Sequence, residues 1–207
     1  MPGKRVPEDV RREQILEAAF GVALREGIGS LTIRAVAAEA SVSHGLVLFH
    51  FGRKELLVHE LLDWIIATHS VLHVSPEVAG VPGAPDRLHA LLRQEMARLS
   101  HEPGHARLFL EYWALGARDE QIRVRVSGEL ERYRAAFRDI MEELLGAEPA
   151  AFVGVTSHGL AALGVSWIYG CAVQVMIDPA HFDVDEYLGA LRGLVGPLLG
   201  RGPSPAP

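Results

Sequence analysis

Apolar residues recur at intervals of three and four along the long segments of the 207-residue chain. No segment alternates apolar and polar residues in the way that a half-buried strand does. This spacing predicts amphipathic helices that pack their apolar faces together. A first helix is predicted from about Val10 to Glu26, with Gly27 as its end, and a fourth begins near Lys54. The pattern therefore predicts an all-α fold.

Further helices follow in the C-terminal part of the chain. Three are marked by apolar positions within 88–96, 108–113 and 122–144, and two more are predicted from about Ala150 to Ile177 and from Asp183 to Leu199. Residues 74–86 hold three Pro and two Gly, which predicts a loop. The predicted parts are residues 1–55, residues 56–200 and a Pro-rich disordered tail at 201–207.

The second and third helices are short and lie close together, between Thr32 and Leu57. Thr32 and Ser43 each precede an apolar run, so each is a predicted N-cap. Residues 41–43 form the turn between the two helices, and Val47 and Phe51, four apart, face inward. Two short helices joined by a tight turn are typical of a helix-turn-helix that places its second helix in the major groove of DNA.

The outward face of that second helix carries the chemistry of DNA recognition. Exposed Leu, Phe and His are unusual on a solvated face, but they suit base edges, thymine methyl groups and phosphates. The predicted base-reading positions and their neighbour are Ser43, His44, Gly45, Leu46, Leu48 and Phe49. The predicted phosphate contacts are Thr32, Arg34, His50 and Lys54.

This region resembles the N-terminal part of the TetR family of bacterial transcriptional regulators. The resemblance rests on RREQILEAAFGVALREG for the first helix and on the ending formed by Phe51, Lys54 and Leu57, and it covers about the first third of the chain. Two positions depart from the family pattern. Ser41 stands where the turn usually has Gly, and Leu48 stands where an aromatic residue is frequent.

The resemblance implies a three-helix DNA-binding domain followed by a larger helical domain for ligand binding and dimerisation. It implies a homodimeric repressor on a palindromic double-stranded operator, released by an unidentified small-molecule inducer. The segment ARLFLEYWALGARDEQIR also resembles the C-terminal part of the branch that controls choline-to-betaine synthesis.

Charge and cysteine content fit this expectation. The net charge is −6, but residues 1–55 hold eight Lys or Arg against seven Asp or Glu, so the acidic excess lies outside the predicted DNA-binding domain. Cys171 is the one cysteine, which excludes an internal disulfide. The polar N-terminus has no apolar signal segment, and a cytoplasmic location is predicted.

The segment around 155–177 is apolar enough to span a bilayer. His158 and Gln174 interrupt it and no Lys or Arg flanks it closely, so burial between a core and a partner subunit is preferred and no membrane is predicted. Six glycines in the last two helices would allow close helix contact, which predicts a homodimer through these helices. They are Gly159, Gly164, Gly170, Gly189, Gly193 and Gly196.

No metal or cofactor site is predicted. His101, Glu102 and His105 match the H-E-x-x-H zinc pattern, but Pro103 breaks the helix that this site requires. His69 shares a helix face with His73, without a third ligand.

Aromatic residues spread over five predicted helices would surround one interior, where they either fill a core or line an inducer pocket. The predicted ligand-binding residues are Trp64, Met96, Phe109, Tyr112, Trp113, Tyr133, Phe137, His158 and Trp167. An enzyme that uses His158 or Glu111 as acid or base is an alternative, which no nucleophile–base pair supports. A helical interaction protein without salt-sensitive DNA binding is another.

Overall fold

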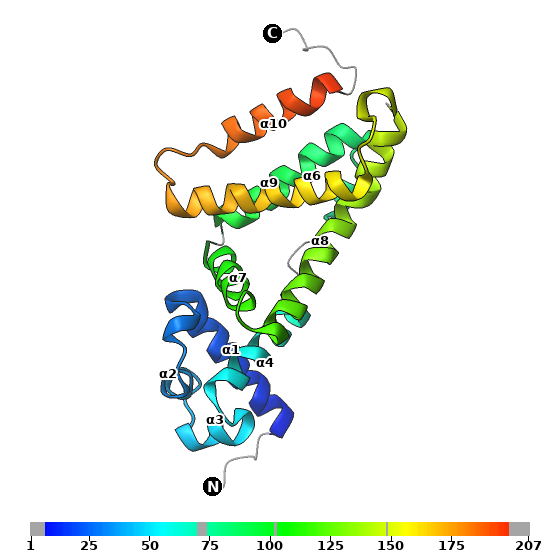
Figure 1. Ribbon diagram of the computed structural model, residues 1–207. Helices are drawn as coiled ribbons and strands as arrows, with labels where there is room; N and C mark the ends of the chain where they lie inside the picture. The colour runs from blue at the N-terminus through cyan, green and yellow to red at the C-terminus, as the bar shows by residue number, and fades with distance from the viewer. Residues whose placement is uncertain (1–6, 70–73, 102, 148, 199–207) are drawn as a thin grey trace. The chain divides into compact units, whose positions relative to one another are not determined.

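The computed structural model describes residues 7–69, 74–101, 103–147 and 149–198, and these residues form helices and connecting turns without a β-strand (Figure 1). The predicted all-α fold is confirmed. The predicted disordered tail at 201–207 lies outside the described residues. Contacts divide the chain into two compact units, which we call the first unit (residues 1–70 and 104–127) and the second unit (residues 71–103 and 128–207).

The first unit contains the helix-turn-helix and the elements that pack against it. The first helix ends at Gly27, as predicted, with φ of 84°. Its elements are α1 (Glu8–Glu26), η1 (Ile28–Ser30), α2 (Ile33–Glu39), α3 (His44–Phe51), α4 (Lys54–Thr68), α7 (Pro103–Gly116) and the beginning of α8 (Glu120–Ala147).

One hydrophobic core joins these elements. Ile15 of α1, Val36 of α2 and Val47 of α3 are fully buried in it, and the small Ala37 is buried where α2 and α3 approach. The core also includes residues far along the chain, namely Leu108 and Tyr112 of α7 and Ile122 and Val126 of α8. Because burial of apolar area is the dominant stabilising force, α7 and the first turns of α8 belong to the core that holds the helix-turn-helix.

The second unit contains the remaining helices. Within it α9 packs along α6, and α10 contacts both of them (Figure 1). Its elements are α5 (Pro76–Ala79), α6 (Ala84–His101), the rest of α8, η2 (Pro149–Phe152), α9 (Ser157–Ile177) and α10 (Val184–Leu198).

Two predicted boundaries in this unit are wrong. Residues 74–86 are not a continuous loop, because Ser75 caps the one-turn helix α5 and accepts a hydrogen bond from Val78 N at 3.2 Å. The helix predicted from Ala150 begins at Ser157 instead. Gly154 has φ of 77°, which interrupts the helix, and the Thr156 side chain caps the new start.

The break predicted at Pro103 is confirmed. The helix α6 ends at His101 and α7 begins at Pro103, so His101 and His105 belong to different helices. Proline is well tolerated at a helix start because its missing N–H has no intrahelical partner there. Asp183 caps α10, since its carboxylate accepts the Glu186 backbone N–H at 2.9 Å.

Candidate nucleic-acid interface

The two helices of the helix-turn-helix begin at the predicted caps. The Thr32 hydroxyl oxygen accepts the Ala35 backbone N–H at 3.1 Å, and the Ser43 hydroxyl oxygen accepts that of Leu46 at 3.2 Å. Each bond satisfies one backbone donor that a helix start leaves unpaired. Each hydroxyl hydrogen remains available to donate to a phosphate oxygen.

The turn between α2 and α3 is tight and carries a strained residue. Ser41 has φ of 53°, which is the left-handed conformation. This agrees with the expectation that glycine usually occupies this turn position. The Val42 backbone N–H donates to the Ala37 carbonyl at 2.9 Å and closes the turn. A non-glycine residue in this conformation costs about 1–2 kcal/mol, which the packing on both sides must offset.

The helix α3 presents a mixed apolar and polar face to solvent. Val47 and Phe51 are buried as predicted, and Gly52 ends the helix with φ of 70°. On the other face Phe49 is 72% exposed, and its ring lies edge-on to His50 at 5.3 Å between centroids. Of the remaining predicted contacts, His44, Gly45 and Leu48 are exposed and Leu46 is half-buried.

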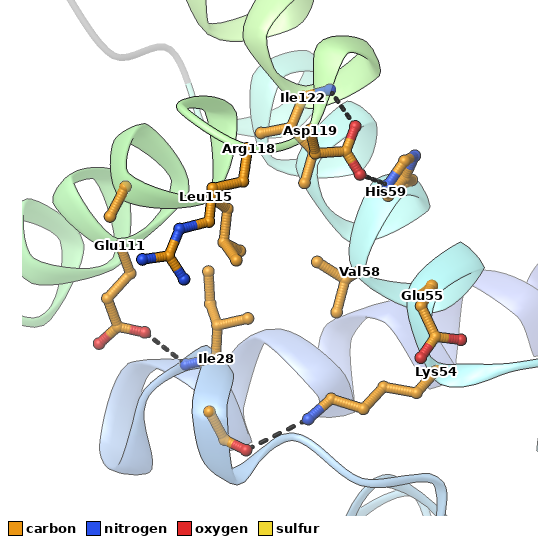
Figure 2. A pocket seen from close by; sticks show the side chains of 12 residues that line it. Ile28, Lys54, Glu55, Val58, His59, Glu111, Leu115, Arg118, Asp119 and Ile122 are labelled. Atoms are coloured by element: carbon orange, nitrogen blue, oxygen red, sulfur yellow. Dashed lines mark hydrogen bonds and ion pairs between the residues drawn. The ribbon is translucent and has the colours of Figure 1, made fainter.

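The predicted phosphate contacts border this face. Arg34 of α2 is exposed and His50 is half-buried. Lys54, at the start of α4, donates from Nζ to the Gly29 carbonyl at 3.2 Å (Figure 2). An ammonium group has three donor hydrogens, so this bond fixes the side chain and leaves donors for a phosphate.

Helix α7 is attached to the end of α1 by charged hydrogen bonds. The Glu111 carboxylate accepts the Ile28 backbone N–H at 2.5 Å (Figure 2). The Arg107 guanidinium donates to the Leu24 carbonyl at 2.5 Å. Gly27 is necessary for this approach, because a Cβ there would lie 2.8 Å from Glu111 Oε1. Each such bond contributes about 1.5–3 kcal/mol.

Tyr112 adds a contact from α7 to α4. Its hydroxyl donates to the Val58 carbonyl at 2.9 Å, and its side chain is 1% exposed. Burial raises the pKa of the hydroxyl well above its ordinary value, so the group remains a neutral donor.

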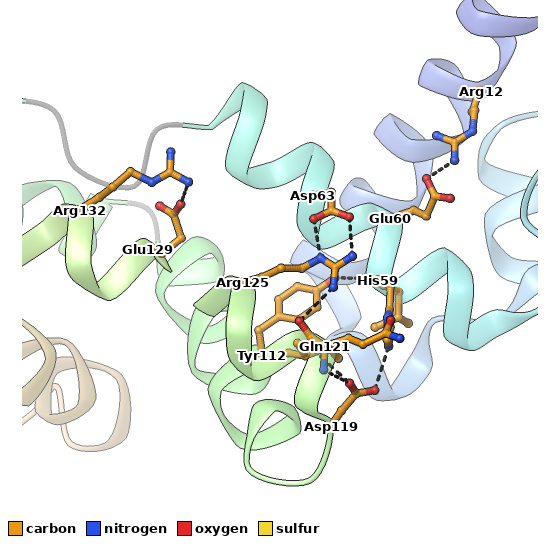
Figure 3. A network of polar contacts seen from close by, with 12 residues as sticks. Arg12, His59, Glu60, Asp63, Tyr112, Asp119, Gln121, Arg125, Glu129 and Arg132 are labelled. Carbon is orange, nitrogen blue, oxygen red and sulfur yellow. Dashed lines mark hydrogen bonds and ion pairs between the residues drawn. The ribbon is translucent and has the colours of Figure 1, made fainter. Parts of the chain in front are cut away.

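The start of α8 is attached to α4 by a second set of polar contacts (Figure 3). The Arg125 guanidinium contacts both carboxylate oxygens of Asp63, at 2.6 and 3.0 Å. The His59 ring lies between Asp119 Oδ2 at 2.9 Å and Gln121 Oε1 at 3.0 Å. The Ile122 backbone N–H, with other donors, holds the pKa of the Asp119 carboxyl below its usual range.

The predicted ligand-binding residues fall into both units. Trp64, Phe109, Tyr112 and Trp113 belong to the first unit, where the Trp64 ring packs edge-on against Phe20 at 5.5 Å. The rings of Phe109 and Trp113 lie 5.5 Å apart.

The other five predicted ligand-binding residues belong to the second unit. Met96, Tyr133 and Phe137 are buried, Trp167 is half-buried, and His158 is exposed in the first turn of α9. As ligand-binding positions, all nine remain predictions.

The second unit has a buried polar cluster that the sequence prediction missed. Glu95 is fully buried and accepts from Arg98 at 2.7 Å, and the same guanidinium donates to the Tyr133 hydroxyl at 3.1 Å. The Tyr169 ring lies 5.7 Å from that of Tyr133.

Glu129 is a second buried acid of this unit. It is 3% exposed and pairs with Arg132, and burial raises its pKa. The sequence contains a sign that Glu129 is buried, because it lies on an apolar helix face, three residues after Val126 and four before Tyr133.

Two families match the chain, one at each end. Residues 15–61 match the family described as bacterial regulatory proteins, tetR family, and residues 84–200 match the C-terminal domain of BetI-type transcriptional repressors. The HTH-type transcriptional regulator BetI of Vibrio parahaemolyticus is 27% identical over 194 residues, covering 91% of this chain and 94% of that protein.

Solved structures share the fold. A transcriptional regulator from Saccharomonospora viridis in complex with choline has a TM-score of 0.73 at 20% identity, covering 91% of this chain and 96% of that one. A regulator from Pseudomonas aeruginosa PAO1 has a TM-score of 0.73 at 24% identity, covering 95% and 93%.

Proposed function

The chain belongs to the TetR family of transcriptional repressors, with a BetI-type C-terminal domain, and from this premise we propose a homodimer that reads a palindromic operator and is released by a small organic cation. Proteins of this family bind DNA through the helix-turn-helix and are not enzymes.

The exposed face of α3 is the main support for the proposed DNA contacts. An aromatic ring with 72% exposure, Phe49, stands beside exposed His44 and Leu48 on a helix fixed by a cap at each end. Apolar groups and imidazoles of this kind match thymine methyl groups and base acceptors in the major groove. The proposed base contacts are Ser43, His44, Leu46, Leu48 and Phe49, with Gly45 beside them. The proposed phosphate contacts are Thr32, Arg34, His50 and Lys54.

Exposed apolar side chains on the last two helices support the dimer. On α9 Leu163 is 50% and Ile177 is 73% exposed, and on α10 Leu194 is 69% exposed. No atom outside the local chain lies within 4 Å of a Cβ built at Gly170, Gly189 or Gly193, so a second copy could approach closely there. Gly164 is different, because a Cβ built there would lie 3.0 Å from Phe137 Cδ1 within the same chain.

The helix α9 is long and apolar enough to cross a bilayer. Its most apolar 18-residue stretch has a mean hydropathy of 1.8, and 33% of that stretch is buried within the chain. One such helix is equally typical of the core of a soluble protein. In this proposal α9 is covered by the partner subunit. The protein then works beside the chromosome, in the cytoplasm.

A small quaternary ammonium compound is the proposed inducer. The S. viridis relative of similar fold was solved with choline. The second unit of this chain supplies the matching chemistry, because the buried Glu95 shares Arg98 with Tyr133 of α8, whose ring lies beside that of Tyr169 of α9. Aromatic faces and carboxylates attract such cations. Inducer binding releases DNA to the extent that its affinity differs between the bound and free states of the repressor.

Selection from randomised duplex DNA, followed by sequencing, tests the proposed dimeric repressor. We expect an enriched inverted repeat whose half-sites are centred about 10 base pairs apart or a multiple of that, because two α3 helices related by twofold symmetry meet the groove at that spacing. The selection is repeated at a higher salt concentration, where binding should weaken for every sequence. Recovery of no motif, with weak binding lost at moderate salt, would favour a helical interaction protein.

Choline should release the selected operator. We expect choline to weaken operator binding by about 5- to 150-fold, the usual range of coupling between two sites. Fluorescence anisotropy of the labelled operator measures the change. The uncharged isostere 3,3-dimethyl-1-butanol is the matched control and should have little effect, because it lacks the cation. Equal release by both compounds would contradict a site built for a cation.

A further inference from the structure

The first unit contains a pocket of about 550 Å³ that the proposed repressor mechanism does not use (Figure 2). It is lined by η1, the first half of α4, the second half of α7, the connection from α7 to α8 and the first turn of α8. Ile28, Val58, Leu115 and Ile122 give it an apolar wall. A concave space of this size with a largely apolar wall suits the body of a small organic molecule.

The carboxylates at this pocket are already compensated. Glu111 accepts the Ile28 backbone N–H at 2.5 Å and lies 3.7 Å from Arg107 Nε. Asp119 accepts the backbone N–H groups of Gln121 and Ile122, at 2.9 and 3.1 Å, in addition to its contact with His59. Glu55 is the third acid, and its side chain is 70% exposed. These partners reduce the repulsion that the acids exert on an anion.

The two basic side chains at the pocket, Arg118 and Lys54, have hydrogen-bond donors that no partner in the described part of the chain uses. Arg118 extends from the α7–α8 connection into the pocket, toward Ile28 (Figure 2). Within the described ranges, no hydrogen bond or ion pair engages its guanidinium group. Lys54 uses one of its donors on the Gly29 carbonyl. A planar guanidinium fork is the side chain best suited to hold a carboxylate through two hydrogen bonds.

We propose that this pocket binds an amphipathic organic carboxylate, with the carboxylate on Arg118 and Lys54 and the apolar body against Ile28 and Leu115. The occupant has the opposite charge to the proposed inducer and binds in the first unit alone. The proposal adds a regulatory input that rests on the proposed function: Lys54 is also a proposed phosphate contact. A carboxylate that engages Lys54 therefore competes with the operator, and by linkage the operator weakens carboxylate binding equally.

Isothermal titration with 2-naphthoate, on the full chain without DNA, tests the site itself. We expect binding to the unaltered protein and a loss of about tenfold or more in affinity for Arg118→Gln, the usual cost of a lost charge-assisted hydrogen bond. The Arg118 side chain is exposed and makes no contact that the fold requires, so the variant should fold normally. Arg123→Gln is the matched control, because Arg123 is an exposed arginine of α8 that does not line the pocket.

Two further titrations define the ligand class. Inorganic phosphate supplies an anion without an apolar body, and 2-naphthamide supplies the body without the charge. Each should bind at least about tenfold more weakly than 2-naphthoate. Equal binding by either compound, equal binding by Arg118→Gln, or no binding of 2-naphthoate to the unaltered protein would overturn the proposal.

The coupling is measured with the selected operator. 2-Naphthoate, at a concentration just sufficient to saturate the unaltered protein, should weaken its operator binding about fivefold or more and should weaken that of Arg118→Gln clearly less. Unchanged operator affinity in an occupied protein would overturn the competition through Lys54. If no operator is found at all, the proposed function fails, while the titrations without DNA still decide the carboxylate site.

Discussion

Replacing Phe49 with aspartate is expected to weaken operator binding at least about a hundredfold while leaving the fold intact. The ring is 72% exposed on α3, so its removal costs little burial. On DNA the change would remove an apolar contact and place a carboxylate beside phosphates and base acceptors, and such like-charge contacts cost several kcal/mol. Fluorescence anisotropy with the selected duplex measures the loss, and thermal unfolding verifies the fold.

Val124→Asp is the matched control for this variant. Val124 lies on α8, is 65% exposed and is absent from the proposed DNA contacts, so the same new charge there should leave operator affinity within about twofold. Operator binding by Phe49→Asp at the affinity of the unaltered protein would show that α3 does not enter the groove as proposed.

Replacing Gly27 with alanine is expected to destabilise the protein by about 3–5 kcal/mol. Gly27 has φ of 84° and ψ of 165°, a conformation that is essentially restricted to glycine and costs other residues about 1–3 kcal/mol. The added Cβ would also displace the Glu111 carboxylate, 2.8 Å away, from its hydrogen bond with Ile28. Urea unfolding measures the loss as a lower midpoint.

Gly29→Ala is the control, two residues further along the chain. A Cβ at Gly29 meets no atom within 4 Å and its backbone is not in the left-handed region, so stability should change by no more than about 0.5 kcal/mol. If the two variants unfold at the same urea concentration, the close approach of α7 to the end of α1 is not as the structure has it.

Local chemistry made the helix-turn-helix predictable. The caps predicted at Thr32 and Ser43 depend on residues within four positions along the chain, and both are confirmed. The longer apolar pattern before Ser157 was misleading, because helical periodicity continued through a segment that Gly154 interrupts. The Pro and Gly content of residues 74–86 predicted only a loop, whereas the Ser75 cap and Pro76 at the helix start form α5 within it.

The partners of polar residues could not be found in the same way. The sequence suggested Glu111 as an acid or base of the alternative enzyme, whereas its carboxylate accepts a hydrogen bond from a backbone N–H 83 positions away. No spacing rule reaches that far, since such a contact depends on how α7 packs. Tyr112, Tyr133 and Phe137 are buried and the four other aromatic side chains of the predicted set are half-buried, but the division of the set between two units depends on the same long-range packing.

The attachment of α7 and the start of α8 to the helix-turn-helix also bears on the construction of chimeric regulators. A chimera joined after residue 55 would separate Glu111 and Arg107 of α7 from their backbone partners at Ile28 and Leu24, at the end of α1. The chimera would then have the donor's DNA specificity, but its hydrophobic core would combine helices from two proteins that do not match in shape. Two segments must be exchanged together, residues 1–70 and 104–127, for the donor's helices to keep their own support.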